Sequence, residues 1–367
     1  MRRNQIATVV EVKGAPYEVG FQHGSSAKAK ITRFLEIVYS RARQYQPALT
    51  NKQHVLKLAD KFLPFAQDWA PDLVEELHGL SDGAGISFAE VFALNCYSEV
   101  TYSPIASSST QLMGCTSFVV SGGALSPPST GPIIGQNEDW GRADSEIFII
   151  LKIKPSQGPS ILMTTPAGFI GYAGRNSQGI GLVQNGLAAT DGRLGVPVAF
   201  VARRVLQQER IGDSVDAIVN SHRSLASNYL IAEESGEAFD IETTATDFDI
   251  FHVEDDIWTH SNYYFSSKLK ALEEKTPSWE SAGCNAFRAG RLKNIFRKNY
   301  GKINSDLTMD ALRDHVNYPR SICRHPDPAK ALDWETSASI VMPMSQSKTY
   351  VTIGNPCNNE FKPFDLG

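Results

Sequence analysis

Cys115 is the residue whose type and surroundings best fit covalent chemistry. Gly114 precedes it, Thr116 and Ser117 follow it, and a run of apolar β-forming residues begins directly afterwards. A thiol at the first position of a strand, behind a residue with a freely bending backbone, suits a nucleophile that processes its own chain. The simpler interpretation is a buried small hydrophobe, which is what most free cysteines are.

A cysteine nucleophile needs a base, a donor for the developing oxyanion and side chains that orient both. Three later stretches could supply these groups: residues 135–140 (Gly-Gln-Asn-Glu-Asp-Trp), 260–263 (His-Ser-Asn-Tyr) and 317–325 (Asn-Tyr-Pro-Arg-Ser-Ile-Cys-Arg-His). The amide of Asn262 could stabilise an oxyanion. Arg324 follows apolar neighbours, so it could be a partly buried cation that holds a carboxylate or lowers the pKa of a thiol.

Each of these stretches also has a simpler interpretation. Polar clusters such as residues 135–140 are usually solvated turns. His260 allows a papain-like pairing of cysteine with histidine, but the local signature around the cysteine is missing, and a histidine at a strand end is more often a structural hydrogen-bonding group. Arg324 could equally be a surface arginine whose stem is buried.

Composition narrows the classes of protein. The chain has 367 residues, of which 42% are hydrophobic and 20% charged, as expected for a globular protein with a sizeable core. The net charge is −5 without a basic cluster, which argues against nucleic acid as a partner. No window approaches the roughly 18 apolar residues of a membrane span, and the N-terminus does not resemble a signal peptide. We therefore expect a cytoplasmic protein without a membrane partner.

The cysteines bear on redox state and on metals. The five are Cys96, Cys115, Cys284, Cys323 and Cys357, an odd number without a Cys-x-x-Cys pair. This scatter argues against a disulfide framework and against a zinc site, and it favours a reducing compartment. We expect neither a metal nor an organic cofactor.

The predicted secondary structure changes at Cys115, from mostly helices before it to mostly short strands after it. Helical periodicity dominates before it, after one strand at residues 6–12: helices are predicted over 24–45, around 55–63, from 71 and from 87, where Ser-Phe-Ala-Glu is a capping box. Residues 101–110 are serine-rich and predict an exposed loop. After Cys115, short strands with Gly, Pro and Ser turns dominate, with helices near 197–219, 287–296 and 312. Strands in blocks between blocks of helices favour stacked antiparallel sheets covered by helices.

Together these stretches resemble the acyl-CoA:6-aminopenicillanic acid acyltransferases (isopenicillin N acyltransferases), which are self-processing N-terminal-nucleophile hydrolases related more distantly to bile-salt and penicillin V amidases. The resemblance runs nearly from end to end, and its order and spacing make it specific. It rests on residues 14–20 (Gly-Ala-Pro-Tyr-Glu-Val-Gly), His23-Gly24, 114–117 (Gly-Cys-Thr-Ser), 135–137 with Asp139, 167–171 with Gly174 and Asn176, 195–197, Ser261-Asn262, 317–319 and 321–324.

The resemblance implies an α+β fold, a four-layer αββα sandwich made as one proenzyme. Cleavage between Gly114 and Cys115 would divide it into residues 1–114, mostly helical, and 115–367, and the two pieces would remain one globular domain as a heterodimer. The implied catalytic residues are Cys115 as nucleophile, Asp139 near the new N-terminus, Asn262 in the oxyanion hole and Arg324. The implied substrate-binding residues are Thr116, Trp140 and Asn185.

The implied chemistry is acyl transfer or hydrolysis of a small amide through a Cys115 thioester, with acyl-CoA as a co-substrate of a transferase. The free α-amine, with a reference pKa of about 7.7–8.0, can serve as base for its own thiol. Two features depart from the family: Glu138 stands where its members have tryptophan, and the peroxisomal C-terminal signal of the penicillin enzymes is missing. Both favour a relative with its own amide substrate. The alternatives are an amidohydrolase that uses no acyl-CoA and a member that has lost catalysis.

Overall fold

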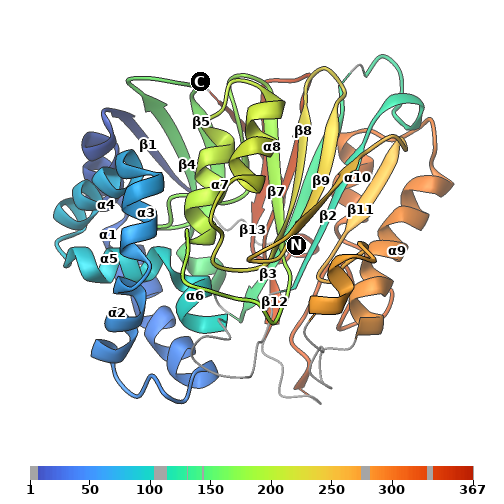
Figure 1. The fold of residues 1–367 in the computed structure, drawn as a ribbon. Coiled ribbons are helices and arrows are strands. Elements are labelled where there is room, and N and C mark those ends of the chain that lie inside the picture. The colour runs from blue at the N-terminus through green and yellow to red at the C-terminus, as the bar shows by residue number, and fades with distance from the viewer. Residues whose placement is uncertain are drawn as a thin grey trace.

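Two β-sheets lie face to face between layers of helices in the computed structural model, which describes residues 7–102, 114–129, 131–142, 144–273, 282–328 and 334–366 (Figure 1). The first sheet has eight strands in the order β1-β4-β5-β6-β7-β8-β9-β10. Their bounds are β1 Thr8–Gly14, β4 Phe148–Pro155, β5 Ile161–Pro166, β6 Gly174–Asn176, β7 Ile180–Gly186, β8 Ser227–Glu233, β9 Ala238–Thr243 and β10 Phe248–His252. All neighbours are antiparallel except β1 and β4.

The second sheet has six strands in the order β11-β2-β3-β12-β13-β14, all antiparallel. Their bounds are β2 Gly114–Val120, β3 Ile133–Gly141, β11 Ile257–His260, β12 Trp334–Pro343, β13 Lys348–Ile353 and β14 Lys362–Asp365. Every residue of β2 and β3 is buried, because β2 and β3 pack against β7 of the first sheet on one face and helices cover the other. Cys115 therefore lies inside the molecule.

The helices form the two outer layers. On the first sheet are α1 Pro16–Tyr45, α2 Lys52–Asp60, α3 Leu63–Trp69, α4 Pro71–Ala84, α5 Phe88–Asn95, α6 Tyr97–Tyr102, α7 Val198–Leu206 and α8 Ile211–Val219. Against the second sheet lie α9 Ala282–Lys298, which contacts β2 and β11, and α10 Ser305–Ala311, which contacts β12. Short 3-10 turns are η1 Gly122–Ala124, η2 Asp144–Ile147 and η3 Leu269–Leu272. The predicted αββα order of layers is thus confirmed.

Glycines let helices α1 and α4 pack backbone to backbone. A Cβ atom at Gly20 would lie 1.8 Å from the carbonyl oxygen of Glu76, and one at Gly79 would lie 1.9 Å from that of Tyr17. Both approaches are far below van der Waals contact, so only glycine fits either position. This explains Gly20 in the motif of residues 14–20 as a packing residue.

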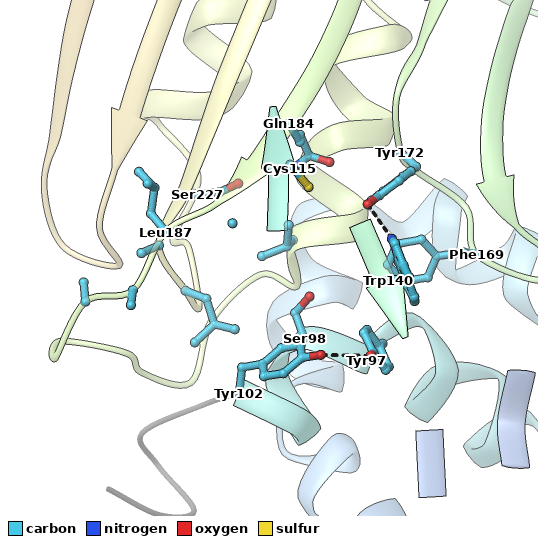
Figure 2. Close-up of a pocket in the computed structure, with 16 residues that line it drawn as sticks. Tyr97, Ser98, Tyr102, Cys115, Trp140, Phe169, Tyr172, Gln184, Leu187 and Ser227 are labelled. Atoms are coloured by element: carbon cyan, nitrogen blue, oxygen red, sulfur yellow. Dashed lines mark hydrogen bonds between the residues drawn. The ribbon is translucent and has the colours of Figure 1, made fainter. Parts of the chain in front are cut away.

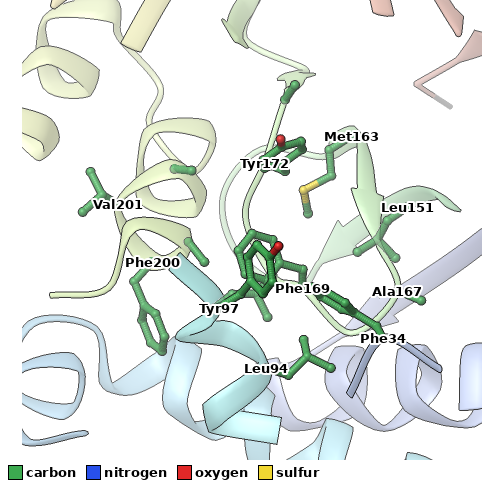
Figure 3. Close-up of a cluster of buried hydrophobic side chains, with 14 of the residues drawn as sticks. Phe34, Leu94, Tyr97, Leu151, Met163, Ala167, Phe169, Tyr172, Phe200 and Val201 are labelled. Atoms are coloured by element: carbon green, nitrogen blue, oxygen red, sulfur yellow. The ribbon is translucent and has the colours of Figure 1, made fainter. Parts of the chain in front are cut away.

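The largest hydrophobic cluster joins chain from both sides of Cys115. Phe34 and Leu94 come from the N-terminal helices, whereas Leu151, Met163 and Phe200 come from strands and a helix after Cys115 (Figure 3). Strand β1 also extends the first sheet by pairing with β4. The residues before Cys115 therefore contribute to the same core as the residues after it.

Most expected elements are found with shifted ends. The helix predicted over 24–45 begins at Pro16, and the capping box at Ser87 opens α5, with the Ser87 hydroxyl accepting from the Glu90 N–H. The serine-rich loop predicted over 101–110 lies almost wholly outside the described residues. None of the helices in the described ranges has the length and apolar character needed to cross a bilayer.

Candidate active site

Strand alternation places Cys115 and Thr116 on opposite faces of β2. Cys115 lines a pocket together with Gln184 and Gly186 of β7, so its side chain is on the face toward the first sheet. Thr116 is on the face toward α9, where its hydroxyl accepts a hydrogen bond of 2.7 Å from Arg288. The sulfur is thereby directed between the sheets, while the polar network that holds the backbone lies behind it.

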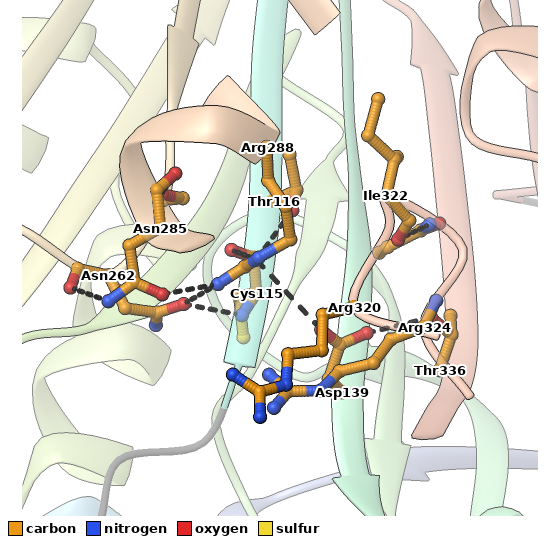
Figure 4. A network of polar contacts seen from close by, with 12 residues as sticks. Cys115, Thr116, Asp139, Asn262, Asn285, Arg288, Arg320, Ile322, Arg324 and Thr336 are labelled. Atoms are coloured by element: carbon orange, nitrogen blue, oxygen red, sulfur yellow. Dashed lines mark hydrogen bonds and ion pairs between the residues drawn. The ribbon is translucent and has the colours of Figure 1, made fainter. Parts of the chain in front are cut away.

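That network fixes both backbone groups of Cys115 (Figure 4). The Cys115 N–H donates to Oδ1 of Asn262 at 2.8 Å, and the Cys115 carbonyl accepts from Nη1 of Arg288 at 2.6 Å. Arg288 Nη2 also donates to Oδ1 of Asn262 at 3.0 Å and to Oδ1 of Asn285 at 2.8 Å. Since the Arg288 side chain is completely buried, these bonds form without competition from water.

The sequence motifs missed Arg288. It lies within the helix predicted over residues 287–296, and the (i, i+3) spacing from Asn285 puts both side chains on one helical face. That spacing was the available signal, yet nothing in it shows that the face meets Cys115. The pairing of α9 with β2 is tertiary information.

The Asn262 amide was expected to donate to an oxyanion, but in the structure it bonds to backbone groups of Gly186 and Cys115. Its Nδ2 donates to the Gly186 carbonyl at 2.9 Å, and its Oδ1 accepts from the Cys115 nitrogen. This geometry holds the nitrogen of Cys115, which is the atom that chain cleavage would convert into an amine.

Asp139 and Arg324 meet at Gly114. Asp139 is opposite Gly114 in the β2–β3 ladder, and its Oδ1 accepts from the Thr336 hydroxyl at 2.7 Å. A Cβ atom at Gly114 would lie 2.5 Å from Arg324 Nη1 and 2.7 Å from Asp139 Oδ2. Arg324 is 2% exposed, so the surface interpretation of this arginine is excluded. Both predicted residues therefore lie against Gly114.

Gly114→Ala should slow chain cleavage strongly, because the new methyl group must displace either the Arg324 guanidinium or the Asp139 carboxylate. A geometric error of about 1 Å at a reacting centre can cost on the order of 10²-fold in rate. The measurement is the fraction of uncut chain on a denaturing gel over time. Gly290→Ala is the matched control, since its added methyl group meets no atom within 4 Å. Equal cleavage of both variants would remove Gly114 from the processing site.

The resting thiol is not a thiolate. Burial, followed by the negative charge of Asp139, raises the pKa of Cys115 to about 12, while Arg288 opposes this shift. A thiol with this pKa needs a base close by to become a nucleophile at neutral pH.

His260 is not placed to be that base. Its Nε2 lies 2.8 Å from Oε1 of Glu242 and 3.9 Å from Asp240 Oδ2, both on β9 of the first sheet. The ring is fully buried, and its partners raise the pKa of His260 even though burial, the largest single influence, opposes them. The structural interpretation of His260 as a buried hydrogen-bonding group thus fits the geometry, and the papain-like pairing does not.

A pocket begins at Cys115, and its empty space, open solvent at its mouth included, is about 790 Å³ (Figure 2). Five aromatic side chains line it, together with small apolar residues and no charged side chain among the described residues that line it. The lining residues are Tyr97, Ser98, Tyr102, Cys115, Trp140, Phe169, Tyr172, Gln184, Gly186, Leu187, Ala188, Ala189, Val198, Leu225, Ala226 and Ser227. Such a lining suits an apolar acyl group held beside a nucleophile.

The polar atoms of the aromatic lining largely satisfy one another. Trp140 Nε1 donates to the Tyr172 hydroxyl at 3.0 Å, and the hydroxyls of Tyr97 and Tyr102 are 2.9 Å apart. Arg41 Nη1 donates to the Tyr97 hydroxyl at 2.9 Å. The ring faces thus remain as the main binding surface.

Two buried side chains explain why the loop at residues 167–171 belongs to the site. His23 Nε2 accepts from the Gly168 N–H at 2.9 Å, and burial lowers the pKa of His23 to about 3, so this ring stays neutral. Asn95 donates to the Gly168 carbonyl and accepts from the Ile170 N–H. Together they fix the loop that carries Phe169 into the pocket.

Of the three predicted substrate-binding residues, one lines the pocket and two do not. Trp140 lines the pocket. Thr116 does not, because alternation along β2 turns it toward α9. Asn185 is also outside the lining, because its amide donates to Ser117 Oγ and Asn228 Oδ1, both at 2.7 Å, while its neighbours Gln184 and Gly186 face the pocket.

Residues 135–140 form a buried strand and not a solvated turn. Asn137 Nδ2 donates to the carbonyls of Leu312 and Ile322, each at 2.9 Å, which ties β3 to the segment before Arg324. Gln136 accepts from the Gln184 N–H at 3.0 Å and so joins the two sheets. The polar side chains of this strand therefore organise the site from within the core.

Glu138 is the unusual member of that strand. It is fully buried opposite Cys115, and neither carboxyl oxygen has a hydrogen-bond partner in the part of the chain that the structure describes. Burial and the neighbouring Asp139 raise the pKa of Glu138 well above its ordinary value. A neutral carboxylic acid therefore stands beside the thiol.

Glu138→Gln should stabilise the fold at neutral pH. Because the folded pKa is raised, only the unfolded chain releases this proton above about pH 4.3, so stability falls as pH rises through that range. Glutamine has nearly the same shape and no proton to release. The gain in free energy of unfolding over wild type should therefore grow from about pH 4.3 toward pH 7, and it should vanish below about pH 4.3. Denaturant unfolding at several pH values measures this, with the exposed Glu360→Gln as control. A variant equally destabilised at every pH would contradict a neutral Glu138.

Two inner sheets between helical layers give the fold of the N-terminal-nucleophile hydrolases, enzymes that transfer or hydrolyse acyl groups. The family model for acyl-coenzyme A:6-aminopenicillanic acid acyl-transferase matches residues 127–358. The chain belongs to this family. The matched range contains Asp139, Asn262 and Arg324, whereas Cys115 lies just before it.

Individual proteins extend the comparison. The chain is 26% identical over 359 residues to the 40 kDa form of acyl-coenzyme A:6-aminopenicillanic-acid-acyltransferase from Emericella nidulans, covering 95% of this chain and 93% of that protein. A stretch of 93 residues, 25% of this chain and 24% of that protein, is 31% identical to β-alanyl-dopamine/carcinine hydrolase from Drosophila melanogaster. Among solved structures, penicillin V acylase from Agrobacterium tumefaciens matches with 11% identity and a TM-score of 0.44, covering 65% of this chain and 83% of the other.

Proposed function

We propose that this protein cuts its own chain between Gly114 and Cys115 and then transfers or hydrolyses the acyl group of a small amide through a Cys115 thioester. The observation that carries the proposal is the position of Cys115, whose sulfur faces an uncharged aromatic pocket while Asn262 and Arg288 hold its backbone. The chain is then a proenzyme, and the mature enzyme is a heterodimer of its two pieces, for which the shared core offers a physical basis. A cytoplasmic location and the absence of an organic cofactor remain part of this proposal.

Cleavage follows from chemistry at the Gly114–Cys115 peptide. The Cys115 sulfur attacks the Gly114 carbonyl carbon, the C–N bond breaks, and the nitrogen takes up the proton that the thiol gives up. Water then hydrolyses the resulting thioester, leaving a carboxylate on Gly114 and a free thiol and amine on Cys115. The Arg324 guanidinium lies against Gly114, which supports assigning it the stabilisation of the negative charge that develops on the Gly114 carbonyl oxygen.

The same groups serve the second reaction. The new amine takes the proton of its own thiol as the sulfur attacks, so it is the nearby base that the raised pKa of Cys115 calls for. The substrate acyl group occupies the aromatic pocket, its carbonyl is attacked, and the amine part leaves with a proton. A second nucleophile, water in hydrolysis or an amine in transfer, then releases the acyl group.

An amide panel tests this function. Purified protein is incubated with aromatic and aliphatic N-acyl amines and N-acyl amino acids, with and without acyl-CoA, and products are followed by mass spectrometry. The expected results are an acyl group covalently bound to Cys115 and a preference for apolar acyl groups. Failure to form any acyl-enzyme across the panel would overturn the proposal. Release of acid without dependence on acyl-CoA would identify the hydrolase alternative, which the local similarity to the carcinine hydrolase favours.

Asn262→Ala distinguishes two roles for Asn262. If its Oδ1 holds the Cys115 amine, as the 2.8 Å bond suggests, the variant should lower the pKa of the amine and move the acidic limb of the rate profile to lower pH. If Nδ2 leaves Gly186 to form the oxyanion hole, kcat should fall by about 10²–10³ at every pH with the limb unmoved. The pH dependence of kcat on processed enzyme separates them. A change confined to KM would exclude both roles.

A further inference from the structure

A second cluster of reactive side chains lies away from the pocket, at the C-terminal end of the chain. Four side chains form it, and we call them the Cys2His2 cluster: His315, Cys323, His325 and Cys357. One ligand atom from each lies within 4.8 Å of all the others. The proposed catalytic steps use none of the four, and the scattered cysteines of the sequence predicted no metal site.

Three distances within the Cys2His2 cluster, all from His325 Nε2, match edges of a tetrahedron around one ion, and the other ligand atoms lie within 4.8 Å of one another. Around zinc, with Zn–S of about 2.3 Å and Zn–N of about 2.0–2.1 Å, a sulfur and a nitrogen are about 3.5 Å apart and two nitrogens about 3.3 Å apart. From His325 Nε2, the observed distances are 3.5 Å to Cys357 Sγ, 3.7 Å to Cys323 Sγ and 3.1 Å to His315 Nε2. All three edges thus agree with a tetrahedral S₂N₂ site.

The backbone around the ligands is held independently of the four side chains. The Cys323 N–H donates to the Asp314 carbonyl at 3.1 Å, and the His325 N–H donates to the Pro319 carbonyl at 2.9 Å. Arg313 Nε donates to the Pro356 carbonyl at 2.9 Å, one residue before Cys357. The ligands are therefore preorganised, which is what a specific metal site requires.

The burial of the cluster also suits a metal. Cys323 is fully buried, Cys357 and His325 are half-buried, and His315 is exposed, so an ion can enter from solvent on the His315 side. Two thiolates with two imidazoles in tetrahedral geometry favour zinc over hard cations. Four protein ligands leave no open coordination position, so the site would be structural and not catalytic.

We propose that the Cys2His2 cluster binds one zinc ion, which fixes Arg324 by tying its segment to the turn after β13. Arg324 stands between the ligands Cys323 and His325, and its carbonyl accepts from Asn355 Nδ2 at 2.8 Å. Asn355 is two residues before Cys357. The ion therefore clamps the segment that places the guanidinium against Gly114.

Metal analysis of the full chain tests the proposal without any activity assay. Wild-type protein, expressed with added zinc and passed through a desalting column, should retain about one zinc per chain. Cys357→Ser and His315→Ala should each lose affinity by more than the 10–100-fold that removing an outer-shell partner costs. His315 is exposed, so folding of His315→Ala is not at risk. Cys284→Ser and Cys115→Ala are matched controls outside the cluster and should keep the zinc.

Cobalt gives a spectroscopic check on the ligand set. Protein stripped with a chelator and titrated with Co²⁺ should show the visible bands of tetrahedral cobalt and a thiolate charge-transfer band, both lost in Cys357→Ser and kept in Cys115→Ala. Chelation should also lower the melting temperature of wild type but not of Cys357→Ser. Wild type that neither retains zinc nor gives these bands would overturn the proposal. A Cys323–Cys357 disulfide in freshly purified wild type, found by intact mass, would also overturn it.

Discussion

Cys115→Ala should yield a single uncut chain without amide-cleaving activity. Alanine removes the nucleophile of both reactions, the acyl shift at Gly114 and the later attack on substrate, while the backbone bonds to Asn262 and Arg288 remain. In a serine hydrolase, losing the nucleophile costs on the order of 10⁶ in kcat. A denaturing gel and N-terminal sequencing measure the first effect: wild type should give two pieces, the second beginning Cys-Thr-Ser-Phe-Val, and the variant one.

Cys284→Ala is the matched control, because Cys284 is also a buried thiol but its sulfur contacts the Arg320 carbonyl and not the pocket. It should be cut and remain active. Cleavage that persists in Cys115→Ala would mean that another protease cuts the chain near the serine-rich segment 101–110. Full amidase activity in an uncut wild-type chain would contradict the free-amine mechanism, and His260 could not replace the amine, since its ring is bonded to Glu242.

The layer order could be predicted from the sequence because hydrophobic periodicity is local. The switch from helical spacing to short β-branched runs at Cys115 corresponds to the start of β2 in the structure. Which strands become neighbours could not be predicted in the same way. β1 pairs in parallel with β4, and β2 lies between β11 and β3, all through contacts between distant segments.

Among the site residues, too, some positions could be predicted from the sequence and others could not. Asp139 and Arg324 could be assigned to the neighbourhood of Cys115 because their motifs match a family, and the structure brings both to Gly114. That the Thr116 hydroxyl meets Arg288 could not be predicted, because the direction of a side chain depends on which face of β2 meets which layer. A register shift of one residue would exchange the roles of Cys115 and Thr116.

The Cys2His2 cluster was beyond sequence reasoning for a related reason. A search for closely spaced cysteine pairs finds metal sites built from one loop, whereas Cys357 reaches His315 only because the turn after β13 packs beside the segment around Arg324. Glu138 was visible as a departure from the family. Its burial without a hydrogen-bond partner emerged only from the pairing with Cys115.

Arg288→Lys should nearly abolish both chain cleavage and turnover while keeping the positive charge. The planar guanidinium binds on two sides at once: Nη1 to the Cys115 carbonyl and the Thr116 hydroxyl, and Nη2 to the two asparagine oxygens. A lysine ammonium is a single point with three donors and cannot span both sides. Since Cys115 and Asn262 would lose their common anchor, we expect a fall of at least about 10²-fold in each rate.

The neighbouring arginine of the same helix supplies the control for Arg288→Lys. Arg291 is paired with Asp314 at 2.6 Å, is partly exposed and does not touch Cys115, so Arg291→Lys should be cut and turn over at near wild-type rates. Melting temperatures of both variants separate misfolding from lost positioning. If Arg288 acts by positioning, a folded Arg288→Lys should lose kcat far more than KM. A folded Arg288→Lys variant with wild-type cleavage would show that cleavage does not need the Arg288 guanidinium on the Cys115 carbonyl.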